Sequence, residues 1–92
     1  MKALPAVDQI RELQLYGGPK AELQLRLAQR PDNRLSIQVL YDLALRYGVI
    51  SPQGAREALA QLPADDASGA EARALLERVL AQGEFFALRT LR

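Results

Sequence analysis

Apolar residues in the middle of the chain recur at every third or fourth position, which is the spacing of one face of an α-helix. Four residues define this stripe: Ile37, Leu40, Ala44 and Tyr47. Gly48 follows them, and glycine readily takes the left-handed conformation that ends a helix. The pattern therefore predicts a helix over residues 34–47.

Similar apolar spacing between proline and glycine stops predicts further helices on both sides. Ser51 has the character of a helix N-cap, and Ser68 with Glu71 has the spacing of a capping box. These helices are expected over residues 6–16, 20–29 and 52–62, and from the Ser68 cap to about residue 82, with a short terminal helix over residues 84–92. The connections are short, which makes neighbouring helices antiparallel.

One segment allows a second interpretation. Leu23, Leu25 and Leu27 alternate with other residues, and this is the period of a half-buried strand. The alanine, glutamate, glutamine and arginine residues around them favour a helix. Helix is therefore the expectation here, and strand is the alternative.

Composition favours helices throughout. The chain has 92 residues, enough for one domain with a modest core, and it is rich in leucine and alanine, both strong helix formers. β-Branched residues are few, whereas a sheet would use many. The expected fold class is all-α, with five or six short antiparallel helices in a single domain over residues 1–92.

Composition also narrows the chemistry. The chain has no histidine and no cysteine, so it lacks the commonest general base and metal ligand and the only thiol nucleophile. We therefore expect no catalysis, no cofactor and no metal site. The 12 basic and 11 acidic residues are mixed without a basic stripe, which makes a nucleic-acid partner unlikely on this pattern. No apolar run is long enough for a membrane span and no signal peptide is recognisable, so a cytoplasmic location is expected.

Residues 32–63 resemble a tetratricopeptide repeat, a helix–turn–helix unit of about 34 residues. Leu40, Leu43, Ala44 and Tyr47 have the spacing of the first helix in that family. The resemblance implies a hairpin of two closely packed helices, in which one side of the first helix lines a groove for partner segments.

A longer stretch resembles the C-terminal repeat domain of thioredoxin-type bacterial co-chaperones. A Leu-Ala-x-x-Pro-Asp-Asn sequence ends at Asn33, an Arg-Ala-Leu-Leu-Glu sequence ends at Glu77, and an Arg-Leu tail ends at Arg92. In that family the repeat domain binds unfolded clients or chaperones. The resemblance therefore implies a protein partner, and it implies no redox chemistry because the Cys-x-x-Cys half is absent here.

One side of the central helix is the expected partner-binding site. Arg34, Gln38, Tyr41 and Leu45 follow one another on a side rotated away from the apolar stripe, and Tyr and Arg are enriched at binding hot spots. The alternative is that neighbouring helices cover Tyr41 and Leu45 in the core.

Phe85 and Phe86 are candidates for a contact between two copies of the chain. Adjacent residues on a helix point about 100° apart, so one ring is expected in the core and the other at the surface, where it could support a homodimer. The alternative is a pair with no role beyond the core.

Two other groups are expected to be unremarkable. Asp65 and Asp66 are adjacent carboxylates, but two supply too few oxygens for a calcium or magnesium site, so a solvated loop is expected. Residues 17–20 precede an expected helix start and could bind an anion, but Pro19 removes one donor, so a plain interhelical turn is expected.

The leading hypothesis is a non-enzymatic protein–protein interaction module of the adaptor or co-chaperone type. A second hypothesis is a small regulator that binds nucleic acid through a helix–turn–helix formed by residues 34–62. A third is a secretion-type chaperone or scaffold subunit.

Overall fold

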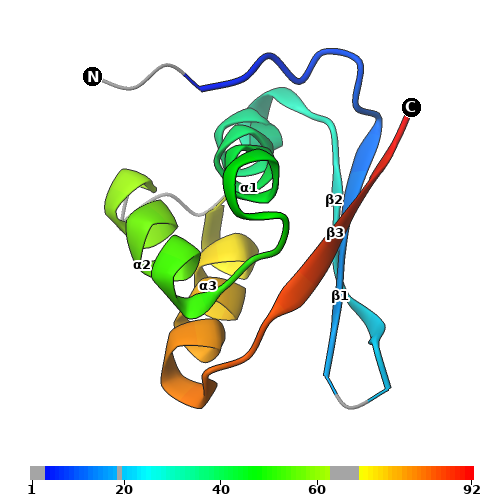
Figure 1. Cartoon of the computed structure of the whole chain (residues 1–92). Coiled ribbons are helices and arrows are strands. Elements are labelled where there is room, and N and C mark those ends of the chain that lie inside the picture. The colour runs from blue at the N-terminus through cyan, green and yellow to red at the C-terminus, as the bar shows by residue number, and fades with distance from the viewer. Residues whose placement is uncertain (1–3, 19, 63–68) are drawn as a thin grey trace.

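The computed structural model describes residues 4–18, 20–62 and 69–92, and within these ranges it contains both strands and helices. The elements in chain order are β1 (Glu12–Gly17), β2 (Glu22–Ala28), the 3-10 turn η1 (Pro31–Asn33), α1 (Arg34–Tyr47), α2 (Pro52–Gln61), α3 (Ala70–Gln82) and β3 (Phe86–Leu91). Figure 1 shows two layers, with the helices all on one face of the sheet. The all-α expectation is wrong, because the fold is α+β.

The expected helices over residues 6–16, 20–29 and 84–92 are replaced by segments that contain β1, β2 and β3. In β1, Leu13 and Leu15 are 0% exposed beneath the helices, whereas Glu12 and Gln14 lie on the opposite face. Leucine prefers a helix over a strand by less than about 1 kcal/mol per residue. Burying one leucine side chain contributes about 1.5–3 kcal/mol, so the alternation of apolar residues outweighs propensity.

β1 is the central strand of a three-stranded antiparallel sheet with the order β2-β1-β3. It forms a hairpin with β2 and pairs on its other side with β3, so segments from the two ends of the chain lie side by side. Gly17 faces Phe86 across β1 and β3, and a methyl group on Gly17 would lie 1.7 Å from the ring atom Cδ1. Glycine is therefore required at position 17 for the ring to enter the core. The turn expected over residues 17–20 between two helices instead lies between the paired strands β1 and β2, and its residue 19 is outside the described residues.

A β-bulge changes the face on which one leucine of β2 lies. Leu15 pairs with Leu25, but the next residue of β1, Tyr16, pairs with Leu23, so Gln24 is the extra residue. Leu23 consequently shares a face with Tyr16 and is 42% exposed. The strand alternative for residues 23–27 is confirmed, but simple alternation would have buried Leu23.

The three helices confirm the predictions for the middle of the chain. α1 and α3 end in left-handed glycines, Gly48 with φ 80° and Gly83 with φ 66°. Ser51 caps α2, because its Oγ accepts a hydrogen bond of 3.2 Å from the N–H of Gly54. The expected capping box of α3 and the expected Asp65–Asp66 loop both involve positions outside the described residues.

One core fills the space between the sheet and the helices. Its largest fully buried side chains include Phe86, Leu13, Leu15, Ile37, Leu40 and Leu76. α1 and α3 pack against the sheet, and α2 packs against these two helices. The hairpin of α1 and α2 is thus not stacked on further helix hairpins, so the tetratricopeptide-type arrangement expected for residues 32–63 is wrong. Among the described residues, no helix combines the length and apolar character needed to cross a bilayer.

Candidate interaction surface

The expected partner-binding residues of α1 have different surroundings. Arg34 Nη1 lies 2.6 Å from Asp8 Oδ1, and Gln38 Nε2 donates a hydrogen bond of 3.1 Å to the carbonyl of Pro5. The segment before β1 therefore engages these two side chains. Tyr41 is partly buried against the core, and Leu45 is 61% exposed. The structure does not present the four as one uninterrupted free face, and partner binding there stays a prediction.

Phe85 and Phe86 divide between surface and core. Phe86 is 0% exposed and Phe85 is 61% exposed. Such a division was expected from helical geometry, but its cause is different here. Phe86 begins β3 with its ring beneath the helices, and successive side chains of extended backbone point to opposite sides.

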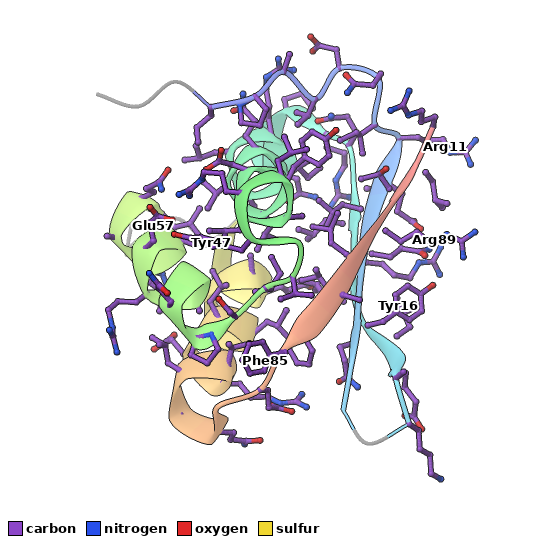
Figure 2. All side chains as sticks on the ribbon, in the orientation of Figure 1. Arg11, Tyr16, Tyr47, Glu57, Phe85 and Arg89 are labelled. Atoms are coloured by element: carbon purple, nitrogen blue, oxygen red, sulfur yellow. The ribbon has the colours of Figure 1, made fainter. Side chains whose placement is uncertain are left out.

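The face of the sheet that points away from the helices carries a regular grid of side chains, and we call it the outer face. Figure 2 shows Tyr16 and Arg89 on this side, together with Arg11 just before β1. The paired residues form three rows across the strands: Leu23–Tyr16–Ala87, Arg26–Gln14–Arg89 and Ala28–Glu12–Leu91. Alternate residues of a strand lie about 7 Å apart and strands about 4.8 Å apart, so the grid measures about 14 Å by about 10 Å.

Hydrogen bonds along β1 hold the middle of the outer face in one arrangement. The hydroxyl of Tyr16 donates to Gln14 Oε1 at 2.7 Å, and Gln14 Nε2 donates to Glu12 Oε2 at 2.6 Å. Arg26 of β2 extends this chain of hydrogen bonds, with its Nη2 3.1 Å from Glu12 Oε1. These hydrogen bonds with Arg26 and Gln14 lower the pKa of Glu12, and the charges of Arg26 and Arg11 lower it further. Glu12 therefore stays ionised and fixes both neighbours.

The charge on the outer face is net positive. Arg26 pairs with Glu12, but Arg11 and Arg89 are exposed, and no acidic side chain of the described residues forms an ion pair with either. Arg89 lies directly across from Gln14, next to the hydrogen-bonded side chains of β1. An exposed guanidinium at a fixed place on a sheet can bind a carboxylate or phosphate through two parallel hydrogen bonds.

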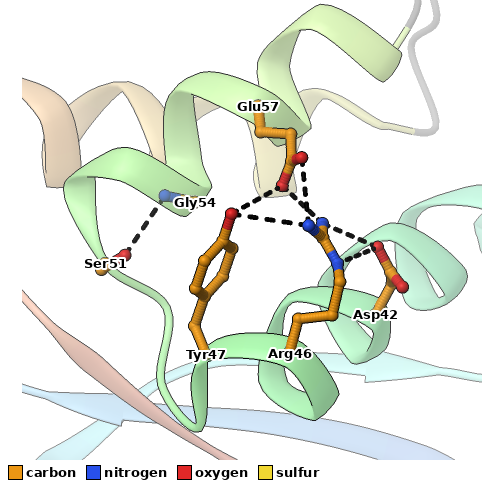
Figure 3. Close-up of polar contacts among 6 residues, drawn as sticks. All are labelled: Asp42, Arg46, Tyr47, Ser51, Gly54 and Glu57. Carbon is orange, nitrogen blue, oxygen red and sulfur yellow. Dashed lines mark hydrogen bonds and ion pairs between the residues drawn. The ribbon is translucent and has the colours of Figure 1, made fainter.

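A second charged cluster joins α1 to α2 and is satisfied internally. Arg46 donates from Nη2 to Asp42 Oδ2 at 2.9 Å and from Nη1 to Glu57 Oε1 at 3.1 Å, and its guanidinium lies 5.0 Å from the centre of the Tyr47 ring (Figure 3). Hydrogen bonds to Glu57, and then to Asp42, raise the pKa of Arg46. Because this arginine is bound within the chain, the cluster positions the two helices and offers no free cation.

In two shallow pockets, an arginine of the lining is bound to an acidic side chain of the chain itself. One of about 220 Å³ lies beside the β1–β2 turn, where Arg78 is bound to Glu84 at 2.7 Å and to Gln24 at 3.3 Å. Another of about 300 Å³ lies at the start of α1, where Arg34 is bound to Asp8. Across the described parts of the chain, no three acidic side chains gather to hold a metal ion.

Sequence reasoning missed Tyr16 and Arg89, which the sheet brings into the outer face. The available signal was period-two alternation in residues 12–17, where polar and apolar residues take turns, whereas residues 86–91 show no such alternation. No part of the sequence signals that the two segments pair with each other, because more than sixty residues separate them.

Comparison of this chain with models of known protein families, with curated proteins and with solved structures gives no match. The resemblance to tetratricopeptide repeats and to the co-chaperone domains thus receives no support from relatives.

Proposed function

We propose that this chain is a non-enzymatic protein-interaction module of the cytoplasm and that the outer face of its sheet is the docking surface. The observation that supports the proposal is the exposed Arg89. It lies across from the hydrogen-bonded side chains of β1 and next to the apolar row that contains Tyr16. In the two pockets described above, Arg78 and Arg34 are instead bound to Glu84 and Asp8 of this chain.

The chemistry of the rows indicates what a partner would offer. Leu23, Tyr16 and Ala87 form an apolar row that an aliphatic or aromatic side chain can cover. Arg89 in the next row fits a carboxylate. The hydroxyl of Tyr16 is already bonded to Gln14, so its ring loses less conformational freedom on binding than a free tyrosine would.

The size of the face sets a limit on the contact. A stable complex buries about 800 Å² on each partner, and a grid of about 14 Å by about 10 Å is smaller. The docking surface therefore either supports a transient contact or continues onto a neighbouring edge of the sheet.

A photo-crosslinking experiment tests the proposal. A benzophenone amino acid replaces Ala87 on the outer face, and in a matched control it replaces Ala60, which is exposed on α2. After irradiation in cells of the source organism, we expect a discrete adduct from position 87 that protease digests and nuclease leaves intact. We expect the adduct to disappear with Arg89→Glu and to persist with Arg56→Glu, since Arg56 is exposed on α2.

Three results would contradict the proposal. Equal crosslinking from both positions would show that the outer face is not special. An adduct that nuclease removes would indicate a nucleic-acid partner. An adduct with the mass of two copies of this chain would indicate self-association instead.

A further inference from the structure

β3 has an outer edge that is only partly paired. Phe86 exchanges two backbone hydrogen bonds with Ile50, of 2.8 Å and 3.0 Å, and both lie on the side of β3 away from β1. Backbone groups of a strand alternate in direction, so Leu88 and Thr90 direct their N–H and C=O groups to that same side. Within the described residues, no backbone or side-chain group pairs with them there.

The opposite edge of the sheet is less available. Asn33 donates from Nδ2 to the carbonyl of Ala28 at 3.1 Å, which occupies one end of β2. The bulge at Gln24 displaces the strand near its other end, and Arg78 of α3 donates to Gln24 Oε1. The free hydrogen-bonding groups of β3 thus form the more regular template for an added strand.

The positive charge of Arg89 on β3 favours one kind of added strand at this edge. A strand bonded to Leu88 and Thr90 places one residue opposite Arg89 in a non-hydrogen-bonded pair, where Cα atoms are about 4.5 Å apart and side chains are closest. Two copies paired antiparallel about this position would bring two guanidinium groups together, and like charges directly opposite destabilise a sheet. A carboxylate in that place would form a charge-assisted pair.

We infer that β3 binds an extended acidic segment of a partner protein as an added antiparallel strand, with a carboxylate opposite Arg89. This inference rests on the proposed function and extends the docking surface from the outer face to its edge. The segment continues the line of pairing that Ile50 begins at Phe86. Its acidic residues lie on the outer face, and its alternate residues lie beside Leu88 on the helix side, where apolar groups fit.

The test uses the full chain, labelled with nitrogen-15, and a short end-blocked peptide that alternates valine and glutamate. We expect amide shifts in the NMR spectrum to concentrate at Leu88, Arg89 and Thr90. Methylating the backbone nitrogens of the valines, which face β3 in this arrangement, should weaken binding by at least about tenfold, because the cost of lost hydrogen bonds exceeds about 1.4 kcal/mol. Methylating the glutamate nitrogens, which face away, should weaken it by less than about twofold.

A charge exchange supplies the matched control. A peptide of alternating valine and lysine should not bind the natural chain, and it should bind the Arg89→Glu variant. Binding of the exchanged peptide would also show that this variant is folded. Arg56→Glu, on α2, should leave binding of the glutamate peptide unchanged.

The outcomes separate the inference from the proposed function. Equal effects of the two methylation patterns, or shifts confined to the outer-face rows, would overturn strand addition and leave docking on the outer face intact. Absence of any shift at saturating peptide would overturn the inference alone, since the crosslink from position 87 decides the proposed function separately.

Discussion

At the scale of single residues, Phe85 and Phe86 differ in how much their side chains contribute to stability. Truncating a buried phenylalanine costs about 3–5 kcal/mol, whereas surface substitutions change stability by about 0.5 kcal/mol or less. We expect Phe86→Ala to lower the free energy of unfolding by the larger amount and Phe85→Ala by the smaller, because Phe86 is 0% exposed and Phe85 is 61% exposed. Urea titrations followed by circular dichroism measure both. Equal losses would contradict the placement of the two rings.

Glu12 provides a pH dependence at the same scale. Its hydrogen bonds with Arg26 and Gln14 lower its pKa below the usual value of 4.5. The stabilisation is therefore complete above pH 4.5 and is lost as the pH falls through the lower pKa of the folded state. We expect Glu12→Gln to remove this part of the acid sensitivity while the remaining carboxylates keep theirs. An NMR titration of the carboxyl group gives the pKa, and unfolding midpoints from pH 7 downwards give the linkage. A Glu12 pKa at or above 4.5 would contradict the hydrogen bonds of Glu12 with Arg26 and Gln14.

At the scale of elements, the start of α2 depends on one side chain. Ser51 Oγ accepts the hydrogen bond from Gly54 that satisfies a backbone donor of the first turn. We expect Ser51→Ala to cost about 1 kcal/mol, and Ser51→Asp to cost much less because aspartate also caps helices. Thermal unfolding of the two variants provides the comparison. Equal stability of Ser51→Ala and the natural chain would show that the cap contributes nothing.

The pairing of β1 with β3 depends on a close approach at another glycine. Because a Cβ at position 17 would overlap the Phe86 ring, we expect Gly17→Ala to cost about 1–3 kcal/mol through overpacking. Gly48→Ala is the matched substitution, since nothing lies within 4 Å of that site and only its left-handed backbone, with φ 80°, opposes a side chain. This control should cost about 1 kcal/mol. Guanidinium titrations measure both, and a Gly17→Ala variant as stable as the natural chain would be inconsistent with the pairing.

At the scale of the whole molecule, the sheet and the core are complete only when β3, the last strand, pairs with β1. A domain of this size has a stability of about 5–14 kcal/mol, and residues 84–92 supply both an edge of the sheet and the buried Phe86. We expect a chain that ends at Gly83 to lose cooperative unfolding and its near-ultraviolet circular dichroism. A peptide of residues 84–92 added in excess should restore both. A truncated chain that still unfolds cooperatively would show that β1 and β2 do not need β3.

The middle of the chain was the part most open to prediction from sequence. α1, α2 and α3 were expected almost where they lie, because periodic apolar residues, the Ser51 cap and the glycine ends are local signals. The candidate surface was harder to predict from the sequence. Arg34 and Gln38 were expected to face a partner, but the chain itself supplies Asp8 and Pro5 to them. Contacts of this kind join distant positions, so no local pattern records them.

The sequence alone determined the alternation of leucines in β2, the helix boundaries of the middle segment and the absence of histidine and cysteine. Only the tertiary structure decided that residues 12–17 and 86–91 are neighbouring strands, that the bulge at Gln24 turns Leu23 outward, and that Tyr16 and Arg89 share a face. The physical reason is one of energy. Leucine's helical preference is a fraction of a kilocalorie per residue and acts locally, whereas burial against distant helices contributes several times more and exists only once the chain has closed.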